Sequence, residues 1–282
     1  MSIVIGIDIG ISSTKLVGIE NGNGIKPPLA VARCEQAPSV YDAFINYIHN
    51  HGIALEEVDE IRLTGVGARE VKFPTCDVSM TCVDEFIANG LGARFGSGMD
   101  QMIVVSMGTG TSLVRVDGDD IRHIGGIGMG GGTLLGLSQL LLHTSDIAKV
   151  ERWAQDGHPN AVNLTIGDIC NGSLNGLFPE ATASLFARAH QDTVSRNDIA
   201  AGLIHMVLET IGSCAVLSQL NGGLKDFVLI GNLTRLEACN HVFPMLEELY
   251  DVRFHIPEYA SYCTALGAAL SFKRDFNQNN KE

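Results

Sequence analysis

A group of polar residues with the composition of a phosphate-binding turn follows the first apolar run of the chain. The run 3–7 predicts a buried strand, and a second apolar run starts at Leu16. Between the two runs lie an acid, a glycine, two serines and a lysine, which are Asp8, Gly10, Ser12, Ser13 and Lys15. A carboxylate can orient metal-bound water, backbone N–H groups beside a glycine bind phosphate oxygens, and a lysine neutralises their charge. The competing interpretation is a surface hairpin with Asp8 as an ordinary turn residue.

Two glycine clusters occur in the apolar segment 103–142. The predicted strand 102–106 runs into the first cluster, which consists of Gly108, Thr109, Gly110 and Thr111. The second cluster, Gly130, Gly131 and Gly132, directly precedes an apolar helix that we expect from Thr133. Glycines let backbone N–H groups approach an anion, and a helix N-terminus adds unpaired N–H groups and a partial positive charge. Either cluster alone is typical of a structural turn, whereas both together favour phosphate binding.

The strand-then-glycine pattern occurs again near the end of the chain. The apolar run 226–230 is followed by Gly231 and Asn232. We expect this turn to approach a nucleoside rather than a phosphate.

Two adjacent carboxylates, Asp84 and Glu85, stand at a predicted junction between a strand and a helix. A carboxylate beside a bound hydroxyl can accept its proton during phosphoryl transfer, a reaction that otherwise requires mainly positioning. The alternative is that both acids only favour the start of a helix, where negative charge is common. The sequence leaves these two interpretations open.

The elements that must position these residues alternate between strands and helices. Further strands are expected at 29–34, at 252–256 and in 61–67, where a strand runs into a glycine turn. Helices are expected at 38–49 with a start near Ser39, at 199–220 after an Asn197-Asp198 cap, at 237–250 and at 261–272. This order predicts an α/β protein with mixed sheets flanked by helices. We expect an N-terminal lobe over 1–100 and a C-terminal lobe over 101–282, with the last helix packing back on the first lobe. The polar stretch 145–197 either lines a substrate pocket or is a surface excursion.

Composition excludes several classes of function. A net charge of −13 over 282 residues argues against a nucleic-acid or anionic-membrane partner. Seven scattered cysteines without a C-x-x-C pair indicate neither a disulfide framework nor a zinc site, which suits the cytoplasm. The first ten residues lack the basic region of a signal peptide and include Asp8.

The three strand-then-glycine patterns resemble those of the actin-like ATPase and sugar-kinase superfamily, in which two ribonuclease H-like lobes bind ATP in the cleft between them. Within that superfamily, the central glycine run is similar to that of the type II pantothenate kinases. The resemblance rests on 108–113, Gly125-Gly126, 130–137, 154–157, 164–169 and 230–232.

This resemblance implies ATP- and Mg²⁺-dependent phosphorylation of the pantothenate hydroxyl by a homodimer. It also implies that the C-terminal lobe carries the substrate pocket and the dimer contact. It assigns the role of base to Glu85, with Asp84 as a rival, and water-mediated Mg²⁺ binding to Asp8. The family has an arginine where this chain has His123, next to Arg122. Arginine is always charged and binds oxyanions in a fork, whereas histidine is largely neutral near pH 7. Either Arg122 reaches the site, or the site accepts a weaker donor, or the acceptor is not pantothenate.

Three other functions remain open on the sequence. A dehydratase activator shares this fold and drives electron transfer with ATP, but its cluster-binding cysteines have no glycine-flanked counterpart at Cys170, Cys214 or Cys239. A kinase of pantetheine, a sugar or an amino sugar is a second alternative, although the zinc-binding cysteine pattern of some sugar kinases is missing. A regulatory relative that binds nucleotide or acyl-CoA is the third, supported only by His123.

Overall fold

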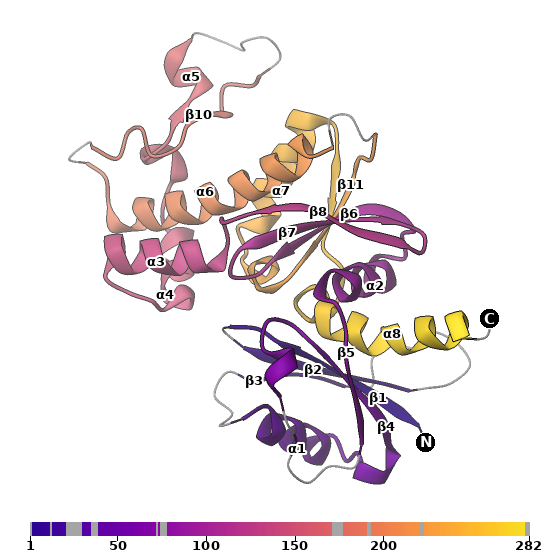
Figure 1. Cartoon of the computed structure of the whole chain (residues 1–282). Coiled ribbons are helices and arrows are strands. Elements are labelled where there is room, and N and C mark those ends of the chain that lie inside the picture. Colours follow the sequence, from indigo (N-terminus) through magenta and orange to yellow (C-terminus); the bar gives the residue numbers. More distant parts are fainter. Residues whose placement is uncertain are drawn as a thin grey trace.

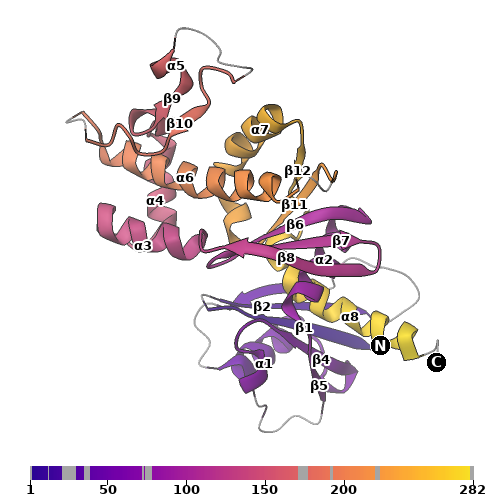
Figure 2. The same cartoon turned by 45° about the horizontal axis from the view of Figure 1, so that its top comes forward.

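Two five-stranded sheets and the helices around them make up most of the protein (Figure 1). The computed structural model describes residues 2–11, 13–20, 30–34, 39–71, 73, 78–170, 177–190, 193–219 and 223–279. The sheets lie one above the other, and helices α2 and α8 occupy the layer between them in both Figure 1 and Figure 2.

The first sheet has the strand order β3-β2-β1-β4-β5. Its strands are β1 (Ile3–Ile9), β2 (Thr14–Glu20), β3 (Ala30–Cys34), β4 (Val58–Thr64) and β5 (Ser79–Cys82). Strands β1, β2 and β3 are antiparallel neighbours, whereas β4 runs parallel to β1 and β5 parallel to β4. Strand β1 is buried on both sides because α1 (Val40–Asn50) covers one face of the sheet and α8 (Cys263–Asn279) the other. As predicted, α1 begins after Ser39, whose side chain accepts a hydrogen bond from the Asp42 amide.

The second sheet has the order β12-β11-β6-β7-β8. Its strands are β6 (Gln101–Met107), β7 (Thr111–Asp117), β8 (Asp120–Ile127), β11 (Asp226–Ile230) and β12 (Arg253–His255). Again the first three strands in chain order are antiparallel, and the last two are parallel additions. One face packs on α2 (Glu85–Ser97), and the other packs on α6 (Arg196–Leu217) and α7 (Cys239–Tyr250).

The two sheets therefore repeat one topology, in which β6, β7, β8, β11 and β12 are the counterparts of β1 to β5. The turn between β1 and β2 occupies the same place in its sheet as the turn between β6 and β7. Gly65 after β4 and Gly231 after β11 are also equivalent, and both have a positive φ, +91° and +95°. A β-carbon at either glycine would lie within 2.6 Å of a carbonyl oxygen of the strand beside it, so only glycine fits. The predicted α/β class with mixed sheets is confirmed.

Small residues allow α2 and α8 to pack closely between the sheets. A β-carbon on Gly92 would lie 1.8 Å from the Cys263 carbonyl oxygen, and one on Gly267 would lie 1.7 Å from that of Ala88. Since such distances are impossible, each glycine is required for the helices to approach. The small residues expected in the last helix serve this contact.

The long helix α6 forms the centre of the larger hydrophobic core. It begins at Arg196 after a Ser195 cap, with Asp198 completing a capping box, so the expected Asn197-Asp198 cap is wrong by two residues. Its length and hydropathy match those of a membrane span, but 61% of that apolar window is buried inside the protein. The helix is explained as a core element.

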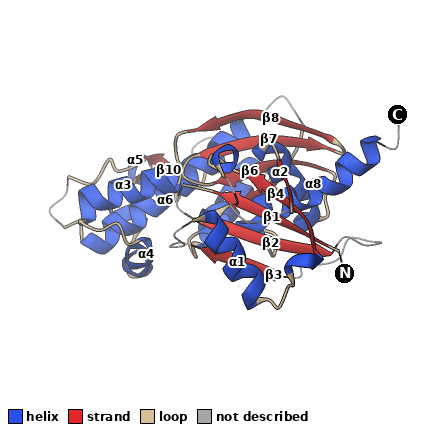
Figure 3. Cartoon of the chain, turned by 60° about the horizontal axis from the view of Figure 1, so that its bottom comes forward, coloured by secondary structure: helices blue, strands red, loops and turns tan. Residues whose placement is uncertain are grey.

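The polar stretch before α6 contains short elements at one end of the molecule, as Figures 2 and 3 show. After α3 (Gly131–Leu142) come α4 (Ile147–Gln155), the 3-10 turn η3 (Pro159–Ala161), β9 (Leu164–Thr165), α5 (Ile166–Ile169) and β10 (Thr182–Ser184). Strands β9 and β10 pair as a separate small sheet. Further 3-10 turns are η1 (Leu55–Glu57), η2 (Ala68–Glu70), η4 (Asn232–Arg235) and η5 (Ala260–Tyr262).

Candidate active site

The first phosphate-turn candidate is built on a buried ion pair. Asp8 and Lys15 are opposite each other in the β1–β2 register, and the Lys15 ammonium lies 2.9 Å from Asp8 Oδ2. Both residues are buried. In a simple surface hairpin, Asp8 would be exposed. The Gly10 amide donates to the Ser13 carbonyl oxygen at 3.2 Å and closes the turn. Ser12 lies outside the described residues.

A polar atom in this turn lacks a partner among the described residues. The Ser13 hydroxyl is buried and makes no hydrogen bond there, and the same holds for the Thr64 hydroxyl beside Asp8. A buried polar group without a partner is costly, and functional sites are where such groups persist. Gly65 completes the neighbourhood, since a β-carbon there would lie 2.9 Å from Asp8 Oδ1.

The two central glycine clusters form one unit. The Gly131 and Gly132 amides donate to the carbonyl oxygens of Gly108 and Thr109 at 2.8 and 2.9 Å. Nearby, the Thr111 hydroxyl donates to the Met129 carbonyl oxygen.

This arrangement corrects one expectation about the second cluster. Helix α3 begins at Gly131 rather than Thr133, and the amides of Gly130, Gly131 and Gly132 already donate within the protein, the first to Thr133 Oγ1. They are not the unpaired N–H groups that we expected to face a phosphate. The start of α3 instead supports the turn 108–110, to which it still presents the positive end of the helix dipole.

The third strand-then-glycine pattern, at Gly231, adjoins the turn 108–110. The position of a Gly231 β-carbon would be 2.5 Å from the carbonyl oxygen of Met107, the residue before Gly108. The Gly231 amide donates to the Ala260 carbonyl oxygen, and Asn232 opens η4. The glycine patterns near 108, 130 and 231 therefore converge, although they are distant in sequence.

The start of α2 separates the roles of the two adjacent acids. Asp84 is exposed and caps the helix, since its Oδ1 accepts hydrogen bonds from the Phe86 and Ile87 amides at 2.9 and 3.1 Å. Glu85 is half-buried, and its pKa is raised, first by burial and then by the Asp8 carboxylate, with Lys15 opposing and Asp84 adding to the effect. A carboxyl group of raised pKa near a phosphate turn has the properties of a general base.

Arg122 and His123 point to opposite faces of the second sheet because they are consecutive residues of β8. The His123 ring stacks on Phe86 at a centroid distance of 4.0 Å, next to Glu85. Arg122 pairs with Asp120 on the exposed edge, where its Nε lies 2.8 Å from each carboxylate oxygen. The structure thus brings His123, and not Arg122, against the first turn of α2, which carries Glu85.

Phe86 and Gly65 are the parts of this arrangement that we did not select from the sequence. The sequence did contain a signal for Gly65 as a turn residue of the site, because it follows an apolar run as Gly231 does. The sequence contained no signal that Phe86 belongs to the site, because an aromatic residue in a helix is ordinarily a core residue. Through Glu85 and Phe86, the first turn of α2 reaches both the Asp8–Lys15 pair and strand β8.

The donors present fit a magnesium ion held mainly through water and phosphate. The only acidic side chain in the β1–β2 turn is Asp8, with its Oδ2 paired to Lys15, and no group of three or more His, Cys, Asp or Glu side chains among the described residues is arranged to hold a metal. Mg²⁺ commonly uses one or two carboxylates together with substrate phosphates rather than an all-protein cage.

The duplicated topology and the paired turns define the actin-like ATPase fold. Solved structures show the same fold. The activator of the 2-hydroxyisocaproyl-CoA dehydratase from Clostridium difficile, solved with bound ADPNP, superposes with a TM-score of 0.68 at 16% identity and covers 99% of this chain and 97% of its own. A ROK hexokinase from Thermus thermophilus gives a TM-score of 0.57 at 13% identity, covering 95% and 98%.

Residues 98–271 match the model of the Fumble family, and the chain belongs to that family. A type II pantothenate kinase of Bacillus anthracis is 25% identical over 250 residues, which are 86% of each chain. Pantothenate kinase 1 of Arabidopsis thaliana is 34% identical over 142 residues, or 47% of this chain, which spans only 37% of that plant protein. The predicted resemblance to type II pantothenate kinases is confirmed.

Proposed function

We propose that this protein is a kinase that transfers the γ-phosphoryl group of ATP to the hydroxyl of pantothenate, giving 4'-phosphopantothenate in the first step of coenzyme A biosynthesis. The family membership and the named pantothenate kinases similar to this chain support the reaction. The observation that carries the proposal is Glu85, a half-buried carboxylate of raised pKa beside the Asp8–Lys15 turn.

In the proposed mechanism, the turns 10–15 and 108–111 bind the β- and γ-phosphates, and Gly231-Asn232 border the adenosine. Glu85 takes the proton of the acceptor hydroxyl as its oxygen bonds to the γ-phosphorus. The bond from that phosphorus to the bridging oxygen breaks, and ADP leaves. Lys15 neutralises phosphate charge and His123 orients the acceptor, whereas Arg122 has no part. A magnesium ion near Asp8 would supply further charge neutralisation.

Homodimerisation and a cytoplasmic location belong to the same proposal. They rest on the resemblance to the family and on the cysteine usage and net charge of the sequence.

The deciding experiment measures ADP release with pantothenate, pantetheine and a panel of sugars as acceptors, with detection of the phosphorylated product. We expect pantothenate to stimulate ADP release most, and Glu85→Gln to abolish that stimulation. Stimulation by a sugar alone would overturn the choice of acceptor. Unchanged turnover in Glu85→Gln would remove Glu85 from the mechanism.

The dehydratase activators are the main alternative because of their fold similarity. At 16% and 18% identity, that similarity extends only to the fold. Iron analysis and the absorption spectrum of the protein purified without oxygen distinguish the two functions, because an activator binds an iron–sulfur cluster and a kinase does not.

A further inference from the structure

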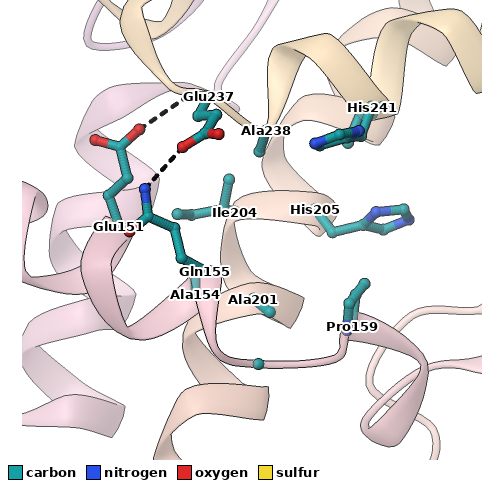
Figure 4. Close-up of a pocket in the computed structure, with 12 residues that line it drawn as sticks. Glu151, Ala154, Gln155, Pro159, Ala201, Ile204, His205, Glu237, Ala238 and His241 are labelled. Carbon is teal, nitrogen blue, oxygen red and sulfur yellow. Dashed lines mark hydrogen bonds between the residues drawn. The ribbon is translucent and has the colours of Figure 1, made fainter.

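A cavity of about 480 Å³ lies between α4, α6 and the start of α7 (Figure 4). Its lining residues come from 151–159, 201–205 and 237–242, so it includes none of the candidate phosphate-binding or acceptor-binding residues. This volume is in the range of pockets that hold small molecules. The proposed reaction gives this cavity no role.

One wall of the cavity is acidic. Glu151 Oε1 accepts a hydrogen bond from the Glu237 amide at 2.8 Å, and Glu237 Oε2 accepts one from the Gln155 side chain at 2.7 Å (Figure 4). Within the described part of the chain, the second oxygen of each carboxylate accepts no hydrogen bond. Two carboxylates with free acceptor capacity therefore lie close together on this wall.

The rest of the lining contains apolar surface and two imidazoles, but no ammonium or guanidinium group. Ala201, Ile204 and Val242 are buried apolar residues, while His205 and His241 project on the side away from Glu151 (Figure 4). Burial and then the Glu151 carboxylate raise the pKa of the neighbouring Cys239 thiol to about 12, which agrees with a negative potential here. Such a lining disfavours phosphates and carboxylates, including ATP and pantothenate.

We propose that this cavity binds a small organic ammonium ion, with its charged group at Glu151 and Glu237 and its hydrocarbon part against Ala201 and Ile204. A bare metal ion fits less well, because the described residues contain no group of three or more acidic, histidine or cysteine side chains with metal-binding geometry. The combination of apolar surface and unpaired carboxylate oxygens selects a cation that also carries hydrocarbon.

The cavity wall is joined to the candidate nucleotide site by a short segment of chain. Glu237 follows η4, which starts next to Gly231, and the Leu233 side chain lies 3.7 Å from the β-carbon position of Gly131. An ammonium ion bound at the free Glu237 oxygen, beside the Gln155 hydrogen bond, restrains the end of this segment. Occupation of the cavity consequently changes nucleotide affinity, a part of the proposal that rests on the proposed function.

Binding is measured by titration calorimetry with three probes of similar shape: cyclohexylammonium, neutral cyclohexanol and anionic cyclohexanecarboxylate. We expect cyclohexylammonium to bind at least tenfold more tightly than either of the others. Glu237→Gln should weaken it at least tenfold, whereas Glu248→Gln, an exposed position of α7 outside the lining, should leave it unchanged. Equal binding of the three probes, or equal loss in both variants, would overturn the site.

The coupling is measured as the affinity for a non-hydrolysable ATP analogue with and without saturating cyclohexylammonium. We expect a change of threefold or more in the wild type and none in Glu237→Gln. An unchanged affinity in the wild type refutes the coupling while leaving the binding site standing. Ammonium binding should persist in Asp8→Asn, so failure of the proposed kinase function and failure of this site give different results.

Discussion

The His123 ring stacks on Phe86, the residue that follows Glu85 in α2, at an interplanar angle of 16°. Phe86 fixes the imidazole on the side of the sheet where the proposed acceptor binds, and Arg122 lies on the other side. We expect His123→Ala to lower kcat/KM for the acceptor by about tenfold to a hundredfold, the range for one lost hydrogen bond to a charged group. Arg122→Ala should stay within about twofold of wild type in the same steady-state assay. A large loss of kcat/KM in Arg122→Ala with little loss in His123→Ala would show that Arg122, and not His123, binds the acceptor.

Replacement of the two adjacent acids should separate base from helix cap. Glu85→Gln removes the proton acceptor at nearly constant shape, and we expect kcat to fall by roughly 10²–10⁴-fold. Asp84→Asn keeps a side-chain oxygen that can cap α2, so its kcat should remain close to wild type. A large loss in Asp84→Asn with an unchanged thermal midpoint would make Asp84 the base.

The pH dependence of the reaction should show the raised pKa of Glu85. Only the ionised carboxylate accepts a proton, so the acidic limb of the kcat profile should lie above the pH at which an ordinary glutamate titrates. Lys15→Met should move that limb to still higher pH, because Lys15 lowers the Glu85 pKa. A limb unmoved by this substitution would contradict the assignment of the limb to Glu85.

Stability should respond to Glu85 in the opposite direction from activity. Folding raises its pKa, so the folded state holds the proton more tightly, and the contribution of Glu85 to stability falls as pH rises from its unfolded pKa through its folded pKa. Above that window, Glu85→Gln should therefore have a higher thermal midpoint than wild type. The advantage should shrink in acid, where both states are protonated. A lower midpoint near pH 7 would show that the ionised carboxylate is stabilising.

The contact between α3 and the 108–110 turn should be sensitive to a single methyl group. A β-carbon on Gly130 would lie 2.5 Å from the Thr109 carbonyl oxygen, so Gly130→Ala must displace the turn. We expect a loss of about 1–3 kcal/mol in unfolding free energy, together with weaker nucleotide binding. Gly136→Ala, in the same helix with no atom within 4 Å of the new carbon, should gain about 0.5–1 kcal/mol. Chemical denaturation of both variants measures the difference.

The sequence by itself determined the class of fold and the chemical character of the site. Apolar runs of strand length that end in glycine set the turns of both sheets, because strand periodicity and glycine backbone freedom are local properties. The same local signals indicated the junction at Asp84-Glu85, the start of α1 after Ser39 and the small residues of α8.

Only the tertiary structure decided which of these residues meet. Asp84 became the cap and Glu85 the half-buried acid because the orientation of α2 between the sheets fixes what each side chain faces. The strand order of the second sheet brings Gly231 to the end of β6, and the packing of β8 against α2 places His123 rather than Arg122 beside Phe86. The amides that open α3 were bound by the neighbouring turn rather than left free. Each of these outcomes depends on contacts between segments distant in the chain, which local sequence patterns do not encode.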